Sequence, residues 1–187
     1  PGGVALLDHE TFDVLRAWET DRGPQRLAYD VWWHLQHNIA VTSEWGTPSM
    51  VENGVDPELL LGRSYGHALH FWELDSGRHL QRVDLGDEHQ MVLELRPAHD
   101  PSATWGFAGV VVSVADLSAS VWRWRREDDG RFTAHKVITI PAEPPRRTNC
   151  LRRSSRSARC RRWSPTSICR WTTAGSTCRR GAPANCT

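Results

Sequence analysis

Apolar and polar side chains alternate in short stretches through residues 1–141, and turn residues such as Gly, Pro, Asp and Ser separate these stretches. A period of two places one face of a β-strand in a core and the other in solvent, whereas a helix repeats its apolar positions every three or four residues. Helical spacing is scarce in this part of the chain. The pattern predicts antiparallel β-sheet, with helix as a minor component at most.

Three segments follow the pattern of a β-hairpin. In each, an alternating strand reaches an acidic or glycine-containing turn and returns as a second alternating strand. The segments cover residues 4–19, 67–85 and 119–140, and they recur roughly every 50 to 60 residues. This recurrence indicates a repeated structural unit.

Two further strand pairs lie between the hairpins and extend the repeat. His37 stands just ahead of the apolar stretch 39–45, and His89, 52 residues later, stands just ahead of the apolar stretch 91–97. Four strands in about 40 to 50 residues form one blade of a β-propeller. We therefore predict an all-β chain that forms a partial β-propeller of about three blades, with a β-sandwich of about six to eight strands as the alternative.

A partial propeller leaves strand edges open. Propellers close with about four to eight blades, so we expect that additional blades are needed to close this one. The sequence begins at Pro1 without an initiator Met and without the pattern of a signal peptide. We expect the true N-terminus of the protein to lie upstream.

Composition divides the chain near residue 145. Residues 1–145 contain all 22 acidic side chains and 12 of the 23 basic ones, a net charge of −10 with His neutral, whereas residues 146–187 contain 11 Arg and no acid, a net charge of +11. All nine His precede this boundary and all five Cys follow it. We predict a partial β-propeller over 1–145 and a basic tail over 146–187 that is disordered, because it has few aliphatic residues and repels itself.

Several protein classes lose support from the sequence. Mean hydropathy is −0.52, and no apolar run reaches the roughly 18 residues of a membrane span, so we expect a soluble protein of the cytoplasm or periplasm. The GxGxxG, P-loop and HExxH motifs are absent. Cys is absent from residues 1–149, which excludes a thiol nucleophile there and leaves histidine as the main candidate for chemistry.

Histidine positions supply candidate metal ligands. His37 and His89 occupy the same place in two successive repeats, ahead of the strand expected to be innermost, where they would face the axial channel of a propeller. Imidazoles that converge at a channel mouth suit copper or another transition metal, and the alternative is that each bonds a loop carbonyl and caps its strand. His99 closes the same strand pair as His89 and is a further metal ligand candidate, or a catalytic group for proton transfer.

One carboxylate and several other side chains need a separate interpretation. Glu44 lies in an otherwise apolar strand, where burial would require a partner, so it is either a catalytic candidate or the anchor of a salt bridge. We expect His67 and His70 to share one face of their strand and to have structural roles. The Trp pair at 32–33 adjoins the His37 position, and the Trp residues of the predicted hairpins fill the core.

Three long segments are distinctive enough to indicate a particular protein family. They are YDVWWHLQHNIAVTSEWGTP (residues 29–48), LLGRSYGHALHFWELDSGRHLQRVDLG (60–86) and EHQMVLELRPAHDPSATWGFAGVVVSVADLSASVWRW (88–124). From residue 1 to about residue 144, the chain resembles the selenium-binding protein family, whose members include methanethiol oxidases. This resemblance implies a seven-bladed propeller roughly two and a half times longer, of which this chain is an internal piece.

The resemblance also implies an activity. Methanethiol, oxygen and water would give formaldehyde, hydrogen sulfide and hydrogen peroxide, with copper as the metal and a small thiol as the substrate. Selenium is a possible family ligand, but the cysteine motif linked to it has no counterpart in residues 1–149. We expect the truncated chain to be inactive by itself. A selenium- or partner-binding propeller without catalysis is the alternative.

The tail matches a shifted reading frame. Back-translation of residues 164–187 with permitted codons, shifted by one base, gives VTDIDLSVDDGRLYVSSWGTGELH, which resembles the family's continuation. We therefore expect the sequence from about residue 146 onward to be an out-of-frame product. Its Arg run would bind phosphates only non-specifically, so no nucleic-acid partner is expected. Its Cys spacings of 10, 9, 9 and 8 residues lack the close pairs of a zinc site.

Overall fold

Strands dominate the protein, whose computed structural model describes residues 3–143. The strands are β1 (Ala5–Leu7), β2 (Val14–Ala17), β3 (Val31–His34), β4 (Ile39–Ser43), β5 (Ala68–Glu73), β6 (Arg78–Asp84), β7 (His89–Pro97), β8 (Trp105–Ser113), β9 (Ala119–Arg126) and β10 (Phe132–Ile140). The helices are η1 (Leu35–His37), α1 (Pro48–Glu52) and α2 (Pro57–Leu61). The tail over 146–187, with its expected disorder and shifted frame, lies outside the described residues.

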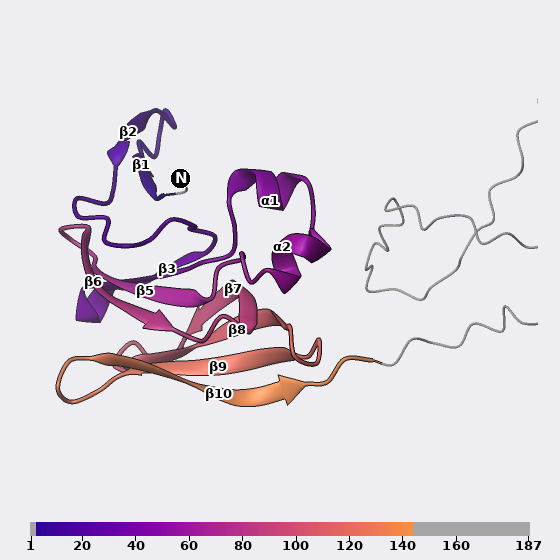
Figure 1. Ribbon diagram of the computed structural model, residues 1–187. Coiled ribbons are helices and arrows are strands. Elements are labelled where there is room, and N and C mark those ends of the chain that lie inside the picture. Colours follow the sequence, from indigo (N-terminus) through magenta and orange to yellow (C-terminus); the bar gives the residue numbers. More distant parts are fainter. Residues whose placement is uncertain (1–2, 144–187) are drawn as a thin grey trace, which may run out of the picture. The chain divides into compact units, whose positions relative to one another are not determined.

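The described strands form three antiparallel sheets. β1 and β2 make a hairpin, β3-β4-β5-β6 make a four-stranded sheet, and β7-β8-β9-β10 make a second four-stranded sheet, each in chain order (Figure 1). The three predicted hairpins are β1–β2, β5–β6 and β9–β10. The prediction of an all-β partial propeller is confirmed, with two complete four-stranded sheets and one hairpin.

The predicted equivalence of His37 and His89 was wrong. His37 ends η1, in the turn between the first and second strands of its sheet, whereas His89 begins β7, the first strand of the next sheet. The strand that precedes His37 is β3, whose consecutive Trp32 and Trp33 do not alternate with polar residues. By strand order, the position that corresponds to the His37 turn is the β7–β8 loop, which contains His99.

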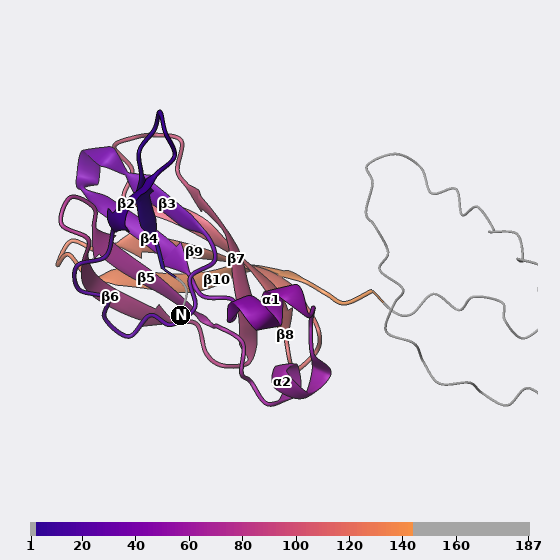
Figure 2. The ribbon, with the colours of Figure 1, turned by 90° about the horizontal axis from the view of Figure 1, so that it is seen from above.

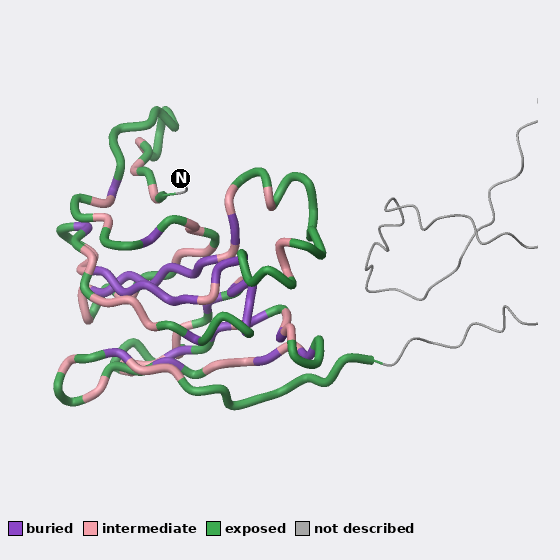
Figure 3. The backbone as a smooth tube through the Cα atoms, in the orientation of Figure 1, coloured by how far each residue is buried: buried purple, intermediate pink, exposed green. Residues whose placement is uncertain are grey.

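Two apolar clusters hold the sheets together. The larger one lies between the two four-stranded sheets, where Phe71 stacks on Phe132 at a ring-centroid distance of 3.9 Å and meets the edge of Trp124 at 5.5 Å. The smaller one joins the β1–β2 hairpin to the first sheet through Trp18, Ala40 and Trp72. Figure 3 shows the result, since the central strands of the first sheet are buried along their length.

Alternation along β4 and β5 assigns each residue to one of these clusters. Leu69 and Phe71 of β5 face the second sheet, whereas Trp72 faces the hairpin. His70 therefore points to the hairpin side, and it is fully buried there. His67 lies outside the strand and pairs with Asp84, so the expectation that His67 and His70 share a face was wrong.

The two α-helices belong to the long connection from β4 to β5, and each begins with a capping side chain. The Thr47 hydroxyl accepts a hydrogen bond from the backbone N–H of Met50, and the Asp56 carboxylate accepts one from Glu58. Figure 2 shows both helices beyond one end of the four-stranded sheets. Every helix within residues 3–143 is too short or too polar to span a membrane.

The contact between the sheets predicts the cost of truncating its central ring. Phe71→Ala removes a fully buried side chain and leaves a cavity between Phe132 and Trp124, so we expect the free energy of unfolding to fall by about 3 to 5 kcal/mol. Phe12→Ala, at a ring that is 73% exposed, should change it by less than about 0.5 kcal/mol. Urea unfolding of the full chain measures both, and equal effects would contradict this assignment of the core.

Candidate functional site

Two histidines project from the turn that joins β3 to β4. His34 ends β3 and His37 ends η1, and their ring centroids lie 4.9 Å apart. Asn38 ends the turn in the left-handed conformation, with φ of 53°, and its backbone N–H donates to the carbonyl of Leu35. The carbonyl and side-chain oxygens of Asn38 accept from the backbone N–H groups of Leu74 and Asp75. The β5–β6 turn thereby holds the histidine turn in place.

The β7–β8 loop lies against this histidine turn. His37 Nε2 lies 3.1 Å from the carbonyl oxygen of Ser102, and because a carbonyl only accepts, Nε2 is the donor. Ser102 is itself held by Asp100, whose carboxylate accepts from both the backbone N–H and the hydroxyl. His37 thus bonds a loop carbonyl, as the alternative to metal binding foresaw.

A groove of about 260 Å³ runs between the two turns. Trp32, Trp33 and His34 line one side, and Pro97, His99 and Pro101 contribute from the β7–β8 loop. The indole rings of Trp32 and Trp33 stack with 5.9 Å between centroids, and both are exposed. The groove therefore offers aromatic faces next to two imidazoles.

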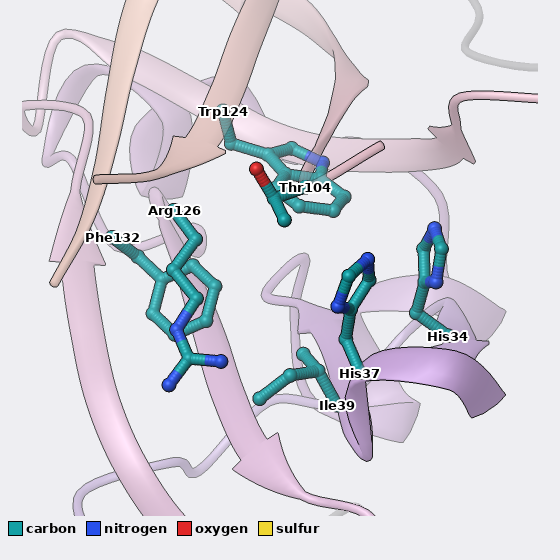
Figure 4. Close-up of a pocket in the computed structure, with 7 residues that line it drawn as sticks. All are labelled: His34, His37, Ile39, Thr104, Trp124, Arg126 and Phe132. Atoms are coloured by element: carbon teal, nitrogen blue, oxygen red, sulfur yellow. The ribbon is translucent and has the colours of Figure 1, made fainter. Parts of the chain in front are cut away.

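A smaller hollow lies on the other side of the histidine turn. Figure 4 shows the imidazoles of His34 and His37 side by side, with Trp124 and Thr104 beyond them. Its volume of about 10 Å³ is close to that of a single water. The indole Nε1 of Trp124 is buried and has no hydrogen-bond partner among the described residues.

The charge state of His34 follows from its surroundings. Burial lowers the pKa of His34, and the neighbouring His37 lowers it further, whereas the Asp100 carboxylate acts in the opposite direction. His34 is therefore a neutral imidazole near pH 7, able to accept a proton or bind a metal.

The sequence-based candidates fall into two groups in space. His37 and His99 lie at the β3–β4 and β7–β8 turns, whereas His89 begins β7 at its opposite end, about 25 Å away for a strand of this length. Glu44 follows the last residue of β4, also away from the His37 turn. Within residues 3–143, no three His, Cys, Asp or Glu side chains converge as a metal site. Metal binding by His37, His89 and His99 stays a prediction.

His89 has its own polar surroundings. Its side chain is 7% exposed, with Nε2 3.0 Å from a carboxylate oxygen of Glu88 and 3.4 Å from Nζ of Lys136. The ring meets the edge of Trp122, and Nδ1 is buried with no hydrogen-bond partner in the described part of the chain. Burial lowers the pKa of His89 and Lys136 lowers it further, against the opposing charges of Glu88 and Asp116.

The carboxylate of Glu44 contacts a buried imidazole. Its side chain is 8% exposed, and its Oε1 lies 2.9 Å from Nε2 of the fully buried His70. The other oxygen lies 3.9 Å from the guanidinium of Arg82. The contact gives Glu44 the partner that its burial requires, and its role as catalytic group or salt-bridge anchor stays a prediction.

Sequence reasoning missed two histidines. His34 was detectable, because a spacing of three residues from His37 places both in one tight turn. His79 was not detectable, since it reaches His70 only through a bulge in the β5–β6 pairing between Phe71 and Trp72. Bulges of this kind leave no mark in the alternation pattern.

A comparison with known protein families identifies the family of this chain. The profile of the family described as 56kDa selenium binding protein (SBP56) matches residues 1–153. The chain belongs to the selenium-binding protein family. Its predicted resemblance to that family is confirmed.

Relatives within the selenium-binding protein family carry two kinds of name. A methanethiol oxidase of Xenopus tropicalis is 37% identical over 142 residues, which are 76% of this chain and 29% of the relative. Selenium-binding protein 2 of Mus musculus is 33% identical over the same shares. The X-ray structure of a hypothetical selenium-binding protein from Sulfolobus tokodaii aligns with a TM-score of 0.73 at 48% identity, covering 77% of this chain and 31% of that one. The chain thus spans less than a third of the length of these relatives.

The surroundings of His89 predict how one charge controls its protonation. Lys136→Met keeps most of the side-chain volume and removes the cation, so we expect the pKa of His89 to rise. A His whose folded-state pKa is depressed loses stability as pH falls below about 6.5, because the unfolded chain binds the proton first. The variant should therefore lose less stability between pH 7 and 5 than the wild type.

NMR titration of the His89 ring and urea unfolding at several pH values measure the two effects. Arg131→Met, which removes a cation just before β10, is the matched control and should leave the pKa of His89 unchanged. An unaltered titration in Lys136→Met would contradict the coupling.

Proposed function

We propose that this chain supplies part of the thiol-oxidising site of a methanethiol oxidase, with its groove at the β3–β4 and β7–β8 turns. The reaction would convert methanethiol, oxygen and water into formaldehyde, hydrogen sulfide and hydrogen peroxide. The observation that carries the proposal is the groove itself, where a neutral imidazole at His34 and the exposed imidazole of His99 flank the stacked rings of Trp32 and Trp33. Relatives named methanethiol oxidase support the same activity.

The chemistry of the groove suits a small thiol. Sulfur makes favourable contacts with aromatic rings, and the faces of Trp32 and Trp33 are exposed next to the histidines. A neutral imidazole accepts the proton that a thiol releases when it is activated. His34 and His99 are the groups of the groove placed to do so, and His37 positions the β7–β8 loop through Ser102.

Copper does not fit the described residues as a complete site. In the part of the chain that the structure describes, no set of three donor side chains converges, and His37 already uses Nε2 to bond Ser102. We propose that His37 and His99 contribute to a copper site only together with ligands from other blades. No step of the reaction is assigned to the metal here.

The groove also fits a non-catalytic role, as a selenium- or partner-binding propeller. The name of the mouse relative favours this second function. A cysteine ligand for selenium would have to come from outside residues 1–149, which contain none. The two functions differ in whether sulfide and peroxide are released.

We propose that activity needs additional blades. Apolar side chains of the β1–β2 hairpin are exposed, among them Phe12 and Val14, and so are Ile138 and Ile140 of β10 at the other end of the stack. Next to β1, an apolar groove of about 290 Å³ is lined by Val4, Leu6 and Trp18, among others. Neighbouring blades of a propeller would cover these surfaces. The separate chain is therefore expected to be inactive.

A chimera tests the proposed site in a complete propeller. The 142 residues of the Xenopus tropicalis methanethiol oxidase that align with this chain are replaced by the corresponding residues of this chain, and sulfide and peroxide release from methanethiol is assayed. We expect an active enzyme. The double variant His34→Ala/His99→Ala should lower kcat/KM by about 100-fold or more, since both groove imidazoles are lost.

His9→Ala is the control, because this exposed residue lies in the β1–β2 turn, away from the groove. Unchanged kcat/KM in the double variant would contradict the site. A chimera with a cooperative melt that releases neither product, beside an active parent enzyme, would favour the non-catalytic function.

We also propose that the sequence after about residue 146 is out of frame. The one-base shift that turns residues 164–187 into family-like text supports this proposal. Resequencing the DNA from about codon 135 past codon 187 tests it, and we expect a single-base difference that restores the frame. A confirmed shift in transcript and genome would instead mark the locus as a disrupted gene.

A further inference from the structure

A second group of titratable side chains lies on the hairpin-facing side of the first sheet, apart from the groove. Glu44 Oε1 lies 2.9 Å from His70 Nε2, and His70 Nδ1 lies 2.9 Å from His79 Nε2. His70 has no exposed surface, whereas His79 is half-buried. The three side chains form a continuous hydrogen-bonded chain from a partly accessible ring to a buried carboxylate.

A bulge in β6 makes this chain possible. Phe71 pairs with Gln81, but Trp72 pairs with His79, so Leu80 is the extra residue. Strand neighbours alternate faces, and without the bulge His79 would point to the opposite side of the sheet from His70. The insertion brings His79 to the face of His70, which already carries Arg82 as its cross-strand neighbour.

The order of donors along the chain follows from its two ends. The carboxylate of Glu44 only accepts, so His70 Nε2 carries a proton and donates it. His70 Nδ1 then accepts from His79 Nε2, which leaves His79 Nδ1 with a free lone pair at the accessible end. In this arrangement the hydrogen-bonding proton of each ring is on Nε2.

The surroundings keep the rings in line. Gly23, with φ of +53°, lies so close that a Cβ atom there would stand 2.4 Å from Cγ of His79. Trp72 meets the His79 ring edge-on at 4.9 Å. The charged groups beside the chain are Asp21, from the segment between β2 and β3, and Arg82 of β6, 3.9 Å from Glu44. Arg82 also binds Asp84, which in turn pairs with His67.

We propose that Glu44, His70 and His79 form a proton relay that delivers a solvent proton to the buried carboxylate. A proton from hydronium bonds to His79 Nδ1, and the Nε2–H bond of His79 breaks as its proton passes to His70 Nδ1. The Nε2–H bond of His70 then breaks as its proton passes to Glu44 Oε1. The net result is one neutral carboxylic acid and two neutral rings whose protons have moved from Nε2 to Nδ1.

The surroundings of the chain favour transfer of the proton along it over a positive charge held on a ring. Burial lowers the pKa of His79, and the neighbouring His70 lowers it further, against the charge of Asp21. A cation is therefore disfavoured on His79, and the hydrogen bonds lead the proton on to the carboxylate at the buried end of the chain. The relay does not depend on the proposed thiol oxidation.

Histidine tautomers report the relay directly. In the full chain labelled with ¹⁵N-histidine, ring nitrogen shifts distinguish Nε2–H, Nδ1–H and imidazolium forms. We expect His70 and His79 to be Nε2–H at pH 8 and to change together to Nδ1–H, with one common midpoint, as the pH is lowered to 4. Separate conversion to imidazolium at two midpoints, or unchanged tautomers over this range, would overturn the proposal.

Two variants and one control assign the proton acceptor. Glu44→Gln keeps an oxygen that accepts from His70 but cannot take the proton, so the common change should disappear. His79→Gln, at the half-buried end, still donates to His70 Nδ1 but breaks the path, and His70 should then keep its Nε2–H form. His67→Gln removes a surface histidine outside the chain and should leave the change in place.

Metal binding is the competing outcome. Two imidazole nitrogens that face each other, with a carboxylate behind one of them, resemble half of a metal site. One equivalent of Zn²⁺ at pH 7 should leave the ring signals of His70 and His79 unchanged. Zinc-induced shifts of both rings that vanish in His70→Gln, or persistence of the joint tautomer change in Glu44→Gln, would show that the chain does not act as this relay.

Discussion

The apolar contact between the two four-stranded sheets determines where every candidate residue lies. Phe71 of the first sheet stacks on Phe132 of the second, with Trp124 against its edge, and this contact sets the two sheets face to face. Two hydrogen bonds to β7 fix how the first sheet is aligned along that strand. The Ser43 hydroxyl donates to the carbonyl of Leu93, and the backbone N–H of Val92 donates to the carbonyl of Glu44. Once the sheets are docked in this way, the β3–β4 turn meets the β7–β8 loop. The groove is thus a product of core packing rather than of local sequence.

The described histidines differ mainly in what surrounds them. His34 borders an open groove and is kept neutral by partial burial and by a second imidazole, so it is available to a ligand. His70 is enclosed on all sides and has both nitrogens engaged by protein groups. His89 is intermediate, with one nitrogen in contact with charged neighbours and one buried with no partner within residues 3–143. The same residue type is therefore open to a ligand at one end of the sheets and enclosed in hydrogen bonds within them.

Sequence alone predicted the parts of this fold that repeat and missed the parts that interrupt a repeat. The hairpins around residues 67–85 and 119–140 follow a plain alternation with turn residues between strands, and the structure contains both. The alternation pattern does not separate β3 from the turn that follows it, because two adjacent Trp residues hide the period of two. For this reason it places His37 in register with His89, which is wrong. The bulge at Leu80 could not be predicted, because its effect appears only when β5 and β6 are paired. Local composition specifies strands and turns, whereas the meeting of side chains depends on register and docking.

The two faces of the first sheet show why a buried polar chain is compatible with this fold. The face towards the second sheet is apolar and supplies the burial that stabilises the pair of sheets. The face towards the hairpin carries Thr42, which accepts from the indole of Trp72 and donates to Gln25, alongside the chain from Glu44 to His79. A buried hydrogen bond adds little net stability, yet removal of one partner is costly because it leaves the other polar group unsatisfied. The hairpin-facing side therefore specifies which groups must meet, because a shift of one residue in β5 would leave Glu44 without His70.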